Sequence, residues 1–114
     1  MLNVKKLLTQ ILSMLYVSQT QTFTACGKNW GFRRIGKVVY VDAPSDITST
    51  TSGWNSIGTL QTGLRPLSTK RIRPANRTDA MYMDIATTGV VRLYCPSAIT
   101  SANNCALSSS YIAQ

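Results

Sequence analysis

The sequence has no histidine and no glutamate, and four aspartates, Asp42, Asp46, Asp79 and Asp84, supply all of its carboxylate side chains. Histidine is the commonest general base and is part of the usual Ser-His-Asp and Cys-His catalytic pairings. A glycosidase needs only two suitably placed carboxylates, so four aspartates are enough in number for glycoside hydrolysis. We nevertheless predict that the chain is not an enzyme.

Cysteine is also scarce, with Cys26, Cys95 and Cys105 as the three residues. Their spacing contains no CxxC pair, so the sequence predicts no metal site and no cofactor. An odd count leaves at least one thiol free. We expect three small, mostly buried thiols in a reducing cytoplasm. A disulfide between Cys95 and Cys105, in an oxidising setting, remains the alternative.

A long apolar run is missing too. Thr9, Gln10 and Ser13 interrupt the apolar N-terminal segment, which is too short and too polar to span a membrane. The same interruptions disfavour a secretory signal peptide. We therefore expect a protein made in the bacterial cytoplasm without a signal peptide, and no membrane insertion.

Residues 1–17 do carry apolar side chains at helical spacing. Val4, Leu8, Ile11 and Leu15 are separated by four, three and four residues, which is the a/d pattern of a coiled coil. Flanking apolar residues widen the stripe and favour more than two helices around one axis. The pattern predicts an amphipathic α-helix over 1–17 whose stripe forms the interface of a homotrimer. A helix packed on its own domain is the alternative.

Residues 18–114 are rich in Thr, Ser, Val, Ile and Tyr, with glycine or proline at short intervals. This composition predicts an all-β head domain, a small antiparallel β-sandwich of jelly-roll-like form. We expect "RRIGKVVYVDA" to be one strand with an irregularity at Gly36, and Trp54 and Ile57 to be packing residues of the next strand. "AMYMDIATTGVVRLYC" predicts a hairpin that turns at Gly89. The expected inward-facing or interface residues are Ile35, Val39, Val41, Met81, Met83, Ile85, Val91, Leu93, Cys95, Leu107, Tyr111 and Ile112.

The octapeptide "TLQTGLRP", residues 59–66, follows the "GWNSIG" strand. Gly63 permits a turn, and Pro66 keeps Arg65 extended. The favoured role of Arg65 is to cap exposed carbonyls at the end of a sheet or to pair with an aspartate. Pairing with a neighbouring subunit or an anionic ligand is the functional alternative.

The chain resembles a known family in this region. "WNSIGTLQTGLRP", the preceding "RRIGKVVYVDA", the hairpin "MYMDIATTGVVRLYC" and the closing "SSSYIA" resemble the C-terminal head domain of tail-fibre, baseplate and minor structural proteins of phages. Those phages and prophages infect Firmicutes and other gut bacteria, and the resemblance covers roughly residues 20–114. It implies a homotrimeric β-sandwich at a virion tail, in contact with other tail or baseplate proteins. It also implies a receptor-binding role toward host cell-wall polysaccharide.

Two other functions compete with this interpretation. The net charge of +8 and the segment "KRIRPANR" suggest a basic nucleic-acid-binding module. The remaining positive residues are dispersed and no nucleic-acid-binding motif is present, so we consider nucleic acid an unlikely partner. The second alternative is a structural spacer that forms trimers and binds no ligand.

Sugar sites in such folds combine an aromatic ring with polar side chains. The loop "RPANRTDAMY" joins both kinds of group next to the end of a strand. We therefore predict ligand binding by Asn76, Arg77, Asp79 and Tyr82. Trp30 and Tyr94 are further candidates for an exposed aromatic platform.

Overall fold

The computed structural model describes residues 3–8 and 17–114. Strands dominate this part of the chain. They are β1 (Val17–Ala25), β2 (Lys28–Ile35), β3 (Val38–Asp42), β4 (Asp46–Ile47), β5 (Gly53–Thr59), β6 (Lys70–Ile72), β7 (Tyr82–Ile85), β8 (Val90–Cys95), β9 (Asn103–Asn104) and β10 (Ser109–Ile112), with a 3-10 turn η1 (Thr62–Leu64). The predicted all-β character is confirmed.

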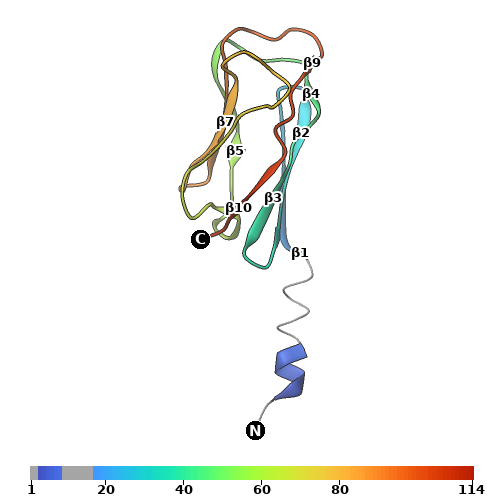
Figure 1. The fold of residues 1–114 in the computed structure, drawn as a ribbon, viewed down its shortest axis with the longest axis vertical. Coiled ribbons are helices and arrows are strands. Elements are labelled where there is room, and N and C mark those ends of the chain that lie inside the picture. Colours follow the sequence, from blue (N-terminus) through green and yellow to red (C-terminus); the bar gives the residue numbers. More distant parts are fainter. Residues whose placement is uncertain (1–2, 9–16) are drawn as a thin grey trace.

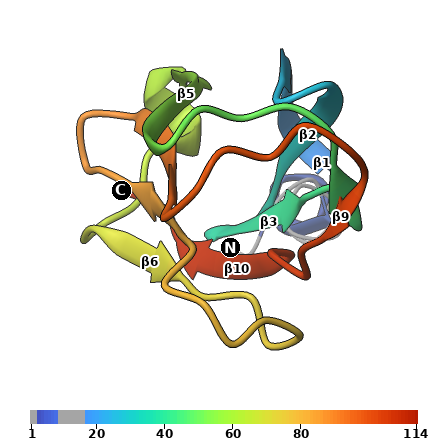
Figure 2. The same cartoon turned by 90° about the horizontal axis from the view of Figure 1, so that it is seen from above.

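The strands form two four-stranded sheets, ordered β1-β2-β3-β10 and β5-β8-β7-β6, and a small pair, β4-β9. Every strand pairing within the described residues is antiparallel, as predicted. Figure 1 shows β5 and β7 on one side of the molecule and β2 and β3 on the other. The view from above in Figure 2 shows β10 and β6 at one margin and β5 and β2 at the opposite margin.

Apolar side chains from both sheets form one core. Alternation along each strand directs every second residue inward, and the predicted inward sets of the β7–β8 hairpin are confirmed. The largest fully buried side chains are Trp30, Phe32, Ile47, Leu60, Leu64, Met81, Met83, Ile85, Leu93, Leu107, Val39 and Val41. Tyr111 is also buried, whereas Ile112 is 52% exposed. The hairpin turns at Gly89, as predicted, with a φ of 92°.

Two predictions for the first sheet are wrong. "RRIGKVVYVDA" is not one strand, because β2 ends at Ile35 and β3 starts at Val38. Gly36 lies in the tight turn between them with a φ of 60°, a left-handed value that glycine adopts without strain. The local apolar pattern continues across this turn, so it gave no sign of the reversal. Trp30, predicted as an exposed platform, is completely buried, and its Nε1–H donates to the Ala25 carbonyl at 2.9 Å.

Hydrogen bonds join the segment 59–66, which follows β5, to strands β2 and β10 of the other sheet. Arg65 Nε donates to the Leu60 carbonyl at 3.2 Å, so the predicted carbonyl-capping role is confirmed. The carbonyl of Gly63 accepts from Arg34 Nη1 at 2.9 Å, and the carbonyl of Leu64 accepts from Tyr111 Oη at 2.6 Å. These hydrogen bonds give the segment an internal structural role.

The described N-terminal residues include a helical stretch, residues 4–8. Asn3 Oδ1 accepts from the Lys6 N–H at 3.0 Å, which is an N-cap bond. Of the predicted interface residues, Val4 and Leu8 are 61% and 52% exposed. Ile11 and Leu15 lie outside the described residues. The strand β1 begins at Val17, one residue before the predicted boundary of the head.

The three thiols are free, as favoured by the sequence. Cys95 and Cys105 are buried, and Cys26 is half-buried. Burial raises the pKa of Cys26 and of Cys105 to about 11. Thiols of this kind are largely protonated at neutral pH and therefore poor nucleophiles.

Candidate ligand-binding site

A polar hollow of about 340 Å³ lies between the loop that leads into β7 and the strand β9. We call it the polar hollow and define it by the residues that line it, which are Asn76, Arg77, Thr78, Asp79, Asn103 and Asn104. Its volume falls in the range of small-ligand sites, about 300–1,000 Å³. Three of the four predicted ligand-binding residues, Asn76, Arg77 and Asp79, therefore meet in one place.

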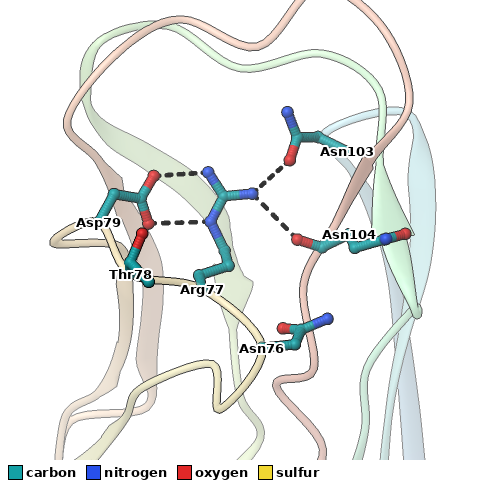
Figure 3. A pocket seen from close by; sticks show the side chains of 6 residues that line it. All are labelled: Asn76, Arg77, Thr78, Asp79, Asn103 and Asn104. Carbon is teal, nitrogen blue, oxygen red and sulfur yellow. Dashed lines mark hydrogen bonds and ion pairs between the residues drawn. The ribbon is translucent and has the colours of Figure 1, made fainter.

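Arg77 is fixed at the centre of the polar hollow (Figure 3). Its Nε donates to Asp79 Oδ1 at 2.9 Å, and its Nη2 donates to the second carboxylate oxygen. On the other side, Nη1 donates to Asn103 Oδ1 and to the Asn104 carbonyl, the latter at 2.9 Å. The side chain of Arg77 is only 14% exposed. One arginine thus connects the 76–79 loop to β9 and holds the two walls of the hollow together.

The charges of the polar hollow neutralise each other. The hydrogen bonds from Arg77 hold the pKa of Asp79 below its usual value, and the same pairing raises the pKa of Arg77. Both side chains therefore stay charged across the neutral range, as a closed pair. A carboxylate held in this state is a poor general acid or base, because its pKa lies far from neutral.

The groups left for a ligand are neutral. Asn76 Oδ1 accepts from the Ala106 N–H at 3.0 Å, which leaves its NH₂ group. Within residues 3–8 and 17–114, no hydrogen-bond partner is found for this NH₂ group, the Thr78 hydroxyl, the Asn103 NH₂ group or the Asn104 side-chain amide. Amides and hydroxyls of this kind suit a ligand rich in hydroxyl groups.

A second hollow of about 270 Å³ borders the first and shares Asn76 with it. Its other lining residues are Ala43, Pro44, Ser45, Ala106, Leu107 and Ser108. The lining contains methyl groups and a proline ring next to two serine hydroxyls. An extended ligand that leaves the polar hollow at Asn76 therefore meets a less polar surface.

Tyr82, the fourth predicted residue, does not line either hollow. It lies on the outer face of the β5-β8-β7-β6 sheet, where Cα pairing aligns it with Tyr94 and aligns Tyr94 with Trp54. Trp54 was predicted to be a packing residue, but it is 41% exposed. Ile57, the other predicted packing residue of this strand, is buried. Residues three apart in a strand point to opposite faces, so Trp54 and Ile57 cannot both face the core.

Sequence reasoning missed Thr78, Asn103 and Asn104 as members of the hollow. Asn103 and Asn104 come about 25 residues after Arg77 in the chain, inside a loop with no periodicity. Their contact with Arg77 depends on the β4–β9 pair, which the sequence did not predict.

The described residues place limits on other kinds of site. Within 3–8 and 17–114, no group of three or more His, Cys, Asp or Glu side chains is arranged to hold a metal ion. The helical residues in the same ranges do not form a helix long and apolar enough to cross a membrane.

Comparison with models of known protein families found no match, and a search of curated proteins found no significant match.

Proposed function

We propose that the chain is a homotrimeric, jelly-roll-like β-sandwich head of a phage or prophage tail, and that it binds host cell-surface glycan in the polar hollow. In this proposal it belongs to the virion tail and neighbours other tail or baseplate proteins. The observation that carries the glycan part is the lining of the hollow. Its charged pair is closed, while neutral amide and hydroxyl groups remain for a sugar.

The position of the polar hollow supports display toward a surface. In Figure 1, β1 begins at the lower end of the head and β9, which lines the hollow, lies at the upper end. A stem that continues from the start of β1 would direct the hollow away from the tail. The loop-built site on a strand scaffold is also the usual arrangement of binding residues.

The exposed apolar side chains near the N-terminus support self-association. Val4 and Leu8 are four residues apart on the helical stretch, so they lie on one face. A helix this short is marginal in water unless it packs on another element. Packing against copies of the same chain removes these side chains from water.

The glycan part is tested by filling the polar hollow. Thr78 is exposed and lines it, so Thr78→Trp places a large side chain where a sugar ring would bind. Thr88 is also an exposed threonine and lies in the β7–β8 turn, so Thr88→Trp is the matched control. On an array of bacterial surface glycans, we expect the wild type and Thr88→Trp to bind the same glycans and Thr78→Trp to lose them. An array without signal for the wild type would favour the ligand-free spacer.

The oligomer part is tested by molar mass in solution. We expect a trimer for the wild type and a monomer for the double variant Val4→Gln/Leu8→Gln, because the apolar stripe is lost. Lys6→Gln, on the same helical stretch, is the control and keeps the trimer. A monomeric wild type would refute the trimer without affecting the glycan test.

A further inference from the structure

The outer face of the β5-β8-β7-β6 sheet carries a second cluster of unusual composition. We call it the aromatic–arginine face. It consists of Trp54, Tyr82, Tyr94, Arg71, Arg73 and Arg92, with Asp84 among them. Strand pairing arranges these side chains in two rows across the sheet. One row follows the aligned residues Trp54, Tyr94 and Tyr82, and the other follows Ser56, Arg92, Asp84 and Arg71.

Each of the three rings has at least one face occupied by a neighbouring side chain. Tyr82 and Tyr94 stack on each other with centroids 5.2 Å apart, and Trp54 meets both of them edge-on. The guanidinium of Arg92 lies 3.9 Å from the centre of the Trp54 ring. Arg71 lies 4.0 Å from the centre of the Tyr82 ring. These rings therefore do not form an open platform on which a base or a sugar ring lies flat.

Positive charge exceeds negative charge on this face. Arg71 makes two hydrogen bonds to the Asp84 carboxylate, at 2.7 and 2.9 Å, and these hold the pKa of Asp84 below its usual value. Arg73 and Arg92 contact ring faces, and within the described residues neither makes a hydrogen bond or an ion pair. Three arginines against one aspartate leave an excess of two positive charges.

The groups that remain at the surface are mostly hydrogen-bond donors. They are the guanidinium N–H groups of Arg73 and Arg92, the indole N–H of Trp54 and the two tyrosine hydroxyls. None of these groups has a partner within residues 3–8 and 17–114. Guanidinium donors that lie on aromatic rings are oriented in advance, so less rotamer entropy is lost when they bind an oxyanion.

We infer that the aromatic–arginine face binds an acidic polysaccharide, a chain of sugars that bears carboxylate or phosphate groups. The charge excess attracts a polyanion, and the donors match its oxygens. Arg73 directly follows β6 and Arg92 lies on β8, so the two unpaired guanidiniums are about two strand spacings apart, roughly 10 Å. Successive charged groups of one extended chain can therefore be contacted together. Single-stranded nucleic acid fits less well, because its bases would need open ring faces to stack on.

This site differs from the polar hollow in residues and in ligand chemistry, and it does not rest on the proposed tail function. The experiment measures binding of polygalacturonate, dextran and an oligodeoxythymidylate at physiological ionic strength. We expect binding of polygalacturonate, which is acidic, and none of dextran, which is neutral. Equal binding of both polysaccharides, or tighter binding of the oligonucleotide, would overturn the inference.

Three double variants distinguish binding at this face from attraction by the net charge of the whole protein. Arg73→Gln/Arg92→Gln removes the two unpaired guanidiniums and should weaken polygalacturonate binding about tenfold. Arg33→Gln/Lys37→Gln removes the same charge from the other sheet and should change binding by less than about twofold. Equal losses in the two double variants would show that net charge alone matters, and would overturn the inference. Arg73→Lys/Arg92→Lys keeps the charge and should lose about threefold; a loss as large as that of the glutamine variant would also overturn it.

Tryptophan fluorescence locates the ligand on the molecule. The chain has two tryptophans, and Trp30 is buried while Trp54 is exposed. Bound polygalacturonate should shield Trp54 from quenching by acrylamide, and Trp54→Phe should abolish this change. An unchanged quenching curve at saturation would place the ligand elsewhere and refute the inference. Thr78→Trp blocks the polar hollow and should retain polygalacturonate binding, measured by calorimetry, because Thr78 lines the hollow and is not part of the aromatic–arginine face.

Discussion

The polar hollow and the aromatic–arginine face both contain an Arg–Asp pair, yet the two pairs have different surroundings. In the hollow, Arg77 uses its remaining donors on Asn103 and Asn104 and is 14% exposed. On the sheet, Arg71 is 48% exposed and lies beside two further arginines. The first pair joins two loops and leaves no net charge, whereas the second belongs to an open face with excess positive charge. The same two residue types therefore build a wall in one place and part of a binding surface in the other.

Arg77→Ala should give the largest effect of the changes made within these two regions. It removes four hydrogen bonds, leaves Asp79 without its partner and separates the 76–79 loop from β9. We expect a loss of about 2 kcal/mol in the free energy of unfolding, measured by urea denaturation. Arg77→Lys keeps the charge without the forked geometry and should lose less. An Arg77→Ala protein as stable as the wild type would show that the arginine does not hold the loops together.

Trp54→Ala should have a smaller effect, because the residue lies on the outer face. It loses the edge-on contacts with Tyr82 and Tyr94 and the contact with Arg92. We expect a loss of about 1 kcal/mol by urea denaturation. By contrast, Trp30→Ala removes a completely buried ring and should cost about 3–5 kcal/mol. Similar losses at both positions would contradict the assignment of Trp54 to the surface.

Acid should give the smallest effect. The folded-state pKa values of Asp79 and Asp84 lie below the unfolded value, which is about 3.9. The stability that these carboxylates contribute is therefore present above about pH 4 and is lost as the pH falls through the folded-state pKa values. The pairs are partly exposed, so the change is modest. Urea denaturation of the wild type and of Asp79→Asn and Asp84→Asn between neutral and acid pH measures it; stability that falls equally in all three would exclude these two groups as its source.

Most of the strands that form the aromatic–arginine face could be predicted from the amino-acid sequence. Alternation in "MYMDIATTGVVRLYC" assigned Met83, Ile85, Val91 and Leu93 to the core, and the structure confirms it. The same period of two directs Tyr82, Tyr94 and Arg92 to the other face. The two tryptophans were assigned the wrong way round. A tryptophan is apolar enough to be buried and polar enough to be exposed. The position of each one in its strand decided between these outcomes: Trp54 pairs with Tyr94 on the outer face, and Trp30 faces the core.

The sequence favoured free thiols and a carbonyl-capping Arg65 over the alternatives to each. Alternation and turn residues by themselves determined the all-β antiparallel character and the hairpin at Gly89. These properties depend on residues close in sequence, where sterics and periodicity act without the rest of the fold. Only the tertiary structure decided that Arg77 meets Asn103 and Asn104, that Trp54 faces water and that Arg71, Arg73 and Arg92 share one face with the aromatic rings. Such contacts join segments far apart in the chain, and their energies depend on a pairing of strands that no local pattern encodes.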